Sequence, residues 1–131
     1  MIGLDTNILV RYLTQDDPIQ SEKATEIIEK QLSEEEPAYF GLVVIAEIVW
    51  VLDRAYGFEA TMIAEAIERI LQTDTFFVET KQEVFAALTA LREGQGEFAD
   101  ALIAELGATA SCRYTLTFDR KAARLPGFSL A

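Results

Sequence analysis

The first seven residues, Met1-Ile2-Gly3-Leu4-Asp5-Thr6-Asn7, place an aspartate directly after a short apolar run. Apolar residues at helical spacing begin at once after it, from Ile8 to Leu13. An α/β protein carries a carboxylate in this way at the carboxyl end of a parallel strand, where such folds bind ligands. The stretch therefore predicts a buried strand over residues 1–5 that presents Asp5 at the ligand-binding edge of a sheet.

The rest of the chain alternates between short apolar runs and segments with helical spacing. This alternation predicts a three-layer α/β/α fold with a central parallel sheet, formed by residues 1–131 as a single domain. Asp17 is expected to cap a helix that begins at Pro18. The segment 43–56 is apolar nearly all round, so we expect it to be buried on most sides. The predicted strands cover residues 1–5, 38–40, 76–78, 114–117 and 128–130, and the predicted helices cover 6–13, 18–32, 43–56, 59–72, 81–92, 98–110 and 119–124.

Composition excludes several kinds of catalytic site. The chain has no histidine and one cysteine, Cys112. A Ser-His-Asp or Cys-His nucleophile is therefore impossible, and a zinc site is nearly excluded. A metal in this protein would have to be held by oxygen atoms, which favours Mg²⁺ or Mn²⁺.

Net charge and hydropathy limit which partners and which cellular compartment we expect for the protein. The net charge is −11, which alone argues against non-specific binding of nucleic acid. Residues 100–131 nevertheless carry four bases and three acids, and so form a locally basic tail. The longest apolar stretch, Leu42 to Leu52, is too short to span a bilayer. With no signal-peptide pattern and a single thiol, which we expect to be buried, the sequence predicts a cytoplasmic protein.

Four acids depart from the polar helix faces that hold most of the others. Asp5 ends a predicted strand, Glu47 interrupts an apolar helix, Asp100 lies in the first turn of a hydrophobic helix, and Asp119 follows the strand ending at Phe118. Each alone is also explained as a helix cap or a buried ion pair, and Asp100 and Asp119 are suitable N-caps. If the four meet, each pair at about 5 Å repels by roughly 3 kcal/mol at an effective dielectric near 20, which a divalent cation would reverse.

Two other α/β classes with an aspartate after the first strand fit less well. A haloacid-dehalogenase-like phosphatase needs a second aspartate two positions later, where this chain has Asn7. A response-regulator receiver needs an acidic pair and a late lysine that are not found in the required places. Both classes are disfavoured by these residues.

Four motifs in series resemble the PIN-domain family, and within it the VapC-type toxins of toxin–antitoxin pairs. They cover nearly the whole chain, and each is weak alone. They are Asp5-Thr6-Asn7-Ile8-Leu9-Val10-Arg11, the stretch from Leu42 to Leu52 around Glu47, Phe98-Ala99-Asp100-Ala101-Leu102-Ile103-Ala104, and Thr115-Leu116-Thr117-Phe118-Asp119-Arg120-Lys121-Ala122-Ala123.

The resemblance implies a function and a set of site residues. Asp5, Glu47, Asp100 and Asp119 match the acidic quartet of the family, which is catalytic and binds Mg²⁺ or Mn²⁺. Thr6, Asn7 and Thr117 match supporting positions, and Glu97 matches a place where some members carry a further acid. The bases Arg11, Arg120 and Lys121 are candidates for RNA contact.

The resemblance also implies an activity and partners. It implies a metal-dependent endoribonuclease that cleaves transfer or ribosomal RNA, a basic VapB-like antitoxin as partner, and a homodimer without membrane attachment. Two alternatives stay open from the residues: a PIN-like RNA-binding module without catalysis, and a metal-dependent phosphatase acting on small phosphate esters.

Overall fold

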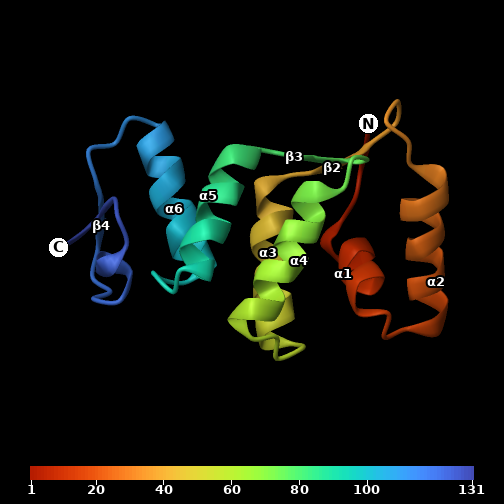
Figure 1. Cartoon of the computed structure of the whole chain (residues 1–131), viewed down its shortest axis with the longest axis horizontal. Helices are drawn as coiled ribbons and strands as arrows, with labels where there is room; N and C mark the ends of the chain where they lie inside the picture. The colour runs from red at the N-terminus through yellow and green to blue at the C-terminus, as the bar shows by residue number, and fades with distance from the viewer. The chain divides into compact units, whose positions relative to one another are not determined.

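A computed structural model describes all residues from 1 to 131. The chain divides into two compact units, Met1–Glu79 and Thr80–Ala131, and each is described here by itself (Figure 1). The predicted single domain over residues 1–131 stays a prediction.

The first unit is built on a parallel sheet with strand order β1-β2-β3. Ile2 of β1 is in register with Ala38 of β2, and Ala38 with Phe76 of β3. The helices α1 and α2 contact each other, and α1 also contacts α3 (Figure 1). The elements are β1 (Ile2–Gly3), α1 (Thr6–Thr14), α2 (Pro18–Glu26), a π-helical turn (Ile27–Gln31), β2 (Ala38–Phe40), α3 (Leu42–Arg54), α4 (Ala60–Gln72) and β3 (Phe76–Val78).

The start of α2 and the start of α3 show how side chains fix these elements. The Asp17 carboxylate accepts hydrogen bonds from the backbone N–H groups of Ile19 and Gln20, which confirms the predicted cap. The Glu79 carboxylate, just after β3, accepts one bond from the Leu42 N–H at 2.9 Å and another from the Tyr39 hydroxyl at 3.1 Å. Glu79 therefore supplies the acceptor that the α3 N-terminus lacks locally, since Gly41 has no side chain to cap it.

The second unit packs two helices against each other and adds a pair of parallel strands. Its buried residues include Val84, Leu88, Phe98 and Leu102. Gly127, with φ of +90°, makes the turn into the last strand, a conformation that other residues rarely adopt. The elements are α5 (Lys81–Arg92), α6 (Phe98–Thr109), β4 (Thr115–Thr117), a 3₁₀ turn (Ala122–Arg124) and β5 (Phe128–Leu130).

The α/β class with parallel strands is confirmed, and most predicted elements lie within a few residues of the observed ones. The expected burial of α3 on most sides is wrong. Only Ile45, Ile48 and Leu52 are buried, whereas Val43 is 80% and Trp50 60% exposed. The helices α1 and α4 contact α3 and cover one stripe of its surface. The rest of the helix surface stays open to solvent.

The first strand and several single side chains are also less buried than expected. The first strand is only two residues long, and Ile2 in it is 40% exposed. Met62 and Phe85 lie in predicted helices 59–72 and 81–92 and are exposed. Cys112, expected to be a buried thiol, is exposed as well, because it follows the end of α6 in a turn.

Candidate functional site

Asp5 lies where the sequence predicted it, between β1 and α1. It is the N-cap of α1, and its Oδ1 accepts a hydrogen bond from the Thr6 N–H at 2.8 Å. Its exposed carboxylate therefore reaches solvent at the end of the strand while one oxygen stabilises the helix.

Glu47 on α3 faces the same cleft as Asp5. This cleft lies between α1 and α3 and has a volume of about 330 Å³. Asn7, Arg11 and Tyr56 also line it. The structure thus brings together two of the four acids singled out in the sequence, from segments forty residues apart.

Thr6 adds an unusual polar atom to this cleft. Its side chain is 5% exposed, and its hydroxyl Oγ1 is buried with no hydrogen-bond partner. Buried hydroxyls are nearly always hydrogen-bonded, because leaving one unpaired costs free energy. An unpaired hydroxyl one residue after Asp5 is therefore suited to a ligand in the cleft.

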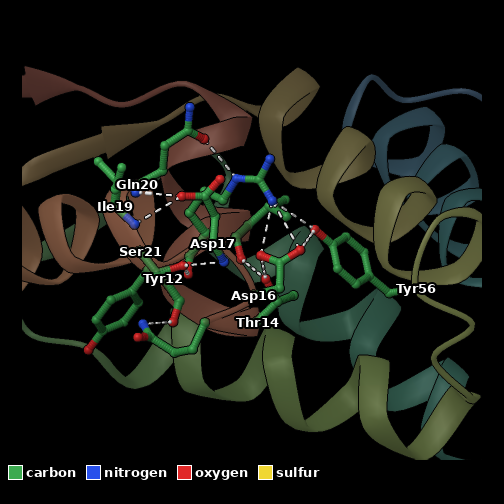
Figure 2. Close-up of polar contacts among 11 residues, drawn as sticks. Tyr12, Thr14, Asp16, Asp17, Ile19, Gln20, Ser21 and Tyr56 are labelled. Atoms are coloured by element: carbon green, nitrogen blue, oxygen red, sulfur yellow. Dashed lines mark hydrogen bonds and ion pairs between the residues drawn. The ribbon is translucent and has the colours of Figure 1, made fainter.

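Arg11, the base on the cleft wall, is held by a polar network that sequence reasoning missed (Figure 2). Its Nη1 donates to both carboxylate oxygens of Asp16 at 3.0 Å and to the Tyr56 hydroxyl at 3.3 Å. The Tyr56 hydroxyl donates to Asp16 at 2.6 Å, and Arg11 Nε donates to Gln20 at 2.8 Å. The hydrogen bond from Tyr56, followed by those from Thr14 and Arg11, holds the pKa of Asp16 well below its usual range.

No local signal could have identified this network. Asp16 and Tyr56, whose hydrogen bond closes it, lie forty positions apart in the sequence. Arg11 pairs with Asp16, and Arg54 lies 3.7 Å from Asp53.

The second unit holds the other two acids. Asp100 lies in the first turn of α6, one turn after Glu97. Partial burial, and then the negative charges of Glu97 and Asp119, raise the pKa of Asp100, while Lys121 opposes the shift. Glu97 and Asp119 are therefore close enough to Asp100 to repel its carboxylate.

Asp119 is held in a turn after β4. Its Oδ1 accepts from the Lys121 N–H at 2.8 Å, and its own N–H donates to the Thr117 hydroxyl at 3.0 Å. Asp119 thus binds the backbone of the turn that leads into the 3₁₀ helix, whereas the N-cap position of that helix is Lys121. Asp100 is in the third position of α6 and does not cap it. Arg120 and Lys121 are both exposed.

The four acids singled out in the sequence are largely open to solvent. Asp5, Glu47 and Asp119 are exposed, and Asp100 is half-buried. Each of the three stands at a helix end or over a cleft, where water reaches a carboxylate even when its neighbours in sequence are apolar. Since Asp5 and Glu47 belong to one unit and Asp100 and Asp119 to the other, the quartet as a single site stays a prediction.

The residues of the cleft fit a hard divalent cation. Its possible donors are the Asp5 and Glu47 carboxylates and the unpaired Thr6 hydroxyl, all oxygen atoms. Mg²⁺ and Mn²⁺ prefer such donors. Within the first unit, no group of three or more acidic or cysteine side chains that could hold a metal ion is found.

Comparison with known proteins places the chain in a family. The sequence model of the PIN-domain family matches residues 2–127, so the chain belongs to the PIN-domain family. The match confirms the predicted PIN-like α/β/α class. A VapC ribonuclease from Aquifex aeolicus (strain VF5) is 27% identical over 122 residues, which is 93% of this chain and 90% of that protein. In this chain, none of the helices has the length and apolar character needed to cross a membrane.

Proposed function

We propose that this protein is the toxin of a toxin–antitoxin pair, and that it is an endoribonuclease dependent on Mg²⁺ or Mn²⁺. The observation that carries the proposal is the cleft lined by Asp5, Glu47 and Thr6, whose hydroxyl is buried without a hydrogen-bond partner. Membership of the PIN-domain family and the similarity to a VapC ribonuclease support the same activity.

The reaction is hydrolysis of an RNA phosphodiester bond. Water adds to phosphorus, the bond to the leaving oxygen breaks, and a proton passes to that oxygen. A bound divalent ion supplies positive charge that stabilises the negative charge developing on the phosphate. Because the chain has no histidine, a carboxylate such as Glu47 is the group suited to accept a proton from the attacking water.

The remaining acids have corresponding roles in this proposal. Asp5 would hold the ion together with Glu47, and Asp100 and Asp119 are the further acids of the proposed catalytic quartet. Thr6, Asn7 and Thr117 orient the carboxylates and water around it. Glu97 is close enough to Asp100 to add a further negative charge.

The net charge bears on the partners in this proposal. A net charge of −11 favours docking of a small basic antitoxin of the VapB type. Contact with RNA must then rely on local bases, for which Arg11, Arg120 and Lys121 are the candidates. We place the protein in the cytoplasm as a homodimer that cleaves transfer or ribosomal RNA.

The test compares cleavage of labelled RNA by the wild type, Asp5→Asn and Glu47→Gln in Mg²⁺. Each variant is expected to lose at least about 100-fold in rate, as is usual when a group that takes part in the reaction is removed. Glu65→Gln is the matched control, since Glu65 is an exposed acid on α4. Chelation with EDTA is expected to stop cleavage by the wild type.

Four results would contradict the proposal. Cleavage that persists in EDTA, or full activity of Asp5→Asn, would exclude the metal site. Metal binding with no RNA turnover would favour a non-catalytic RNA-binding module. Turnover of an aryl phosphate but not of RNA would favour a phosphatase.

A further inference from the structure

A second hollow adjoins the cleft on the other side of Arg11. It lies between α1 and α2 and has a volume of about 200 Å³. Asn7 and Arg11 line both the hollow and the cleft that holds Asp5 and Glu47. An extended ligand that leaves the cleft past Arg11 would therefore meet this hollow next.

The charge of the hollow differs from that of the surface around it. The first unit carries 16 acids and 5 bases. Two of those bases, Arg11 and Lys23, line the hollow, and none of the acids does. Lys23 is exposed and makes no salt bridge. The hollow is thus a basic spot on an acidic unit, which attracts an anion.

Arg11 is held in a fixed position between the two spaces. Gln20 binds its Nε, and Asp16 and Tyr56 bind its Nη1, as Figure 2 shows around the guanidinium group. These bonds leave Nη2 as the nitrogen without a partner. A fixed, planar guanidinium with a free nitrogen is well suited to bind a phosphate. Its partial neutralisation by Asp16 makes Lys23 the main source of positive charge in the hollow.

The floor of the hollow is apolar and includes Ile8, Ala24 and Ile27. A nucleotide has the same two-part chemistry, since its phosphate is charged and its sugar and base offer apolar faces. We infer that this hollow is a subsite for the nucleotide flanking the scissile bond, with Lys23 and Arg11 on its phosphate and Asp16, Tyr56 and Gln20 as the positioning residues of Arg11. The inference rests on the proposed ribonuclease function.

The test measures the salt dependence of binding of a short labelled single-stranded RNA to the full chain. Calcium is the only divalent ion present, and a gel confirms that the RNA stays intact. Loss of one phosphate contact lowers the slope of log K against log salt by about 0.7 for a single strand. Lys23→Ala is expected to show this decrease, and Lys23→Arg to restore the wild-type slope.

Lys30→Ala is the matched control. Lys30 is also an exposed lysine of the first unit, lies seven residues further along, and does not line the hollow. It is expected to keep the wild-type slope. In turnover with Mg²⁺, Lys23→Ala is expected to raise KM and to leave kcat unchanged, because a flanking contact is equally strong in the ground and transition states.

Equal slopes for Lys23→Ala and Lys30→Ala would overturn the subsite, as would a loss of kcat without a change in KM in Lys23→Ala. Failure of the proposed function is detected by a separate measurement: RNA cleavage would then persist in the Asp5→Asn variant or in the presence of EDTA. The binding measurement does not need turnover, so the two failures are distinguishable.

Discussion

Replacing Thr6 by valine is expected to make the protein more stable and less active. Threonine and valine have nearly the same shape, so the change removes the hydroxyl and leaves the packing in place. The Thr6 hydroxyl is buried without a hydrogen-bond partner. An unpaired buried polar group costs about 1–3 kcal/mol, so Thr6→Val should gain about 1 kcal/mol of unfolding free energy.

The gain is measured by urea unfolding followed by circular dichroism. A stabilisation of 1 kcal/mol corresponds to a rise in Tm of about 4 °C for a chain of this size. Metal-dependent cleavage should fall at the same time by about 10- to 100-fold, the usual loss when a group that supports a metal site is removed.

Thr14→Val is the matched control on the same helix. The Thr14 hydroxyl lies 2.8 Å from the Val10 carbonyl and 2.8 Å from Asp16 Oδ1, so its removal should destabilise the protein by about 1 kcal/mol. A Thr6→Val variant less stable than the wild type would refute the reasoning about the unpaired hydroxyl. A more stable variant with undiminished cleavage would refute a role for Thr6 in the site.

Three further substitutions test the fold of the first unit. Leu52→Ala should cost about 3 kcal/mol in urea unfolding, because Leu52 is fully buried, and a loss below about 1 kcal/mol would contradict that burial. Glu79→Ala should cost at least about 1 kcal/mol, because it removes the acceptor for the Leu42 N–H at the α3 N-terminus, and unchanged stability would exclude this cap. Asp16→Asn should be less stable than the wild type at neutral pH. Since hydrogen bonds from Tyr56 and others lower the pKa of Asp16 in the folded state, its contribution is present above the ordinary pKa of 3.8 and lost as the pH falls below it. The difference between the wild type and Asp16→Asn should therefore shrink at about pH 3, and a constant difference would show that the charge is not responsible.

The helices and strands could be predicted because their signals are local. Pro18 after Asp17, and Gly127 after a short apolar turn, mark element ends through their own backbone preferences. Apolar residues at helical spacing likewise located α4 and α5 within a residue of their observed bounds.

The burial of side chains was predicted less accurately than the helices and strands, because burial depends on how much surface the neighbouring elements cover. Glu47 in an apolar helix looks buried in the sequence, but the helix leaves that side open to a cleft. Val43 and Trp50 belong to the same helix and are exposed for the same reason.

The position of Asp5 could be predicted from the sequence, whereas the contacts around the cleft could not. Asp5 could be located because it follows a strand and caps a helix, which are both local properties. The network of Arg11, Asp16 and Tyr56 could not, because the bond that closes it joins residues forty positions apart. Its members have no unusual spacing, and only the packing of α1 beside α3 brings them together.

The exposed face of α3 has a practical consequence for spectroscopy. Trp50 is the only tryptophan of the chain, and it lies one helical turn after Glu47. Because the indole is already largely in water, unfolding changes its surroundings little, and its fluorescence is a poor measure of folding. The same exposure makes it a sensitive optical reporter of anything that covers this face. Protection of the indole from a soluble quencher would detect an antitoxin or a second copy of the chain on α3 without any added label.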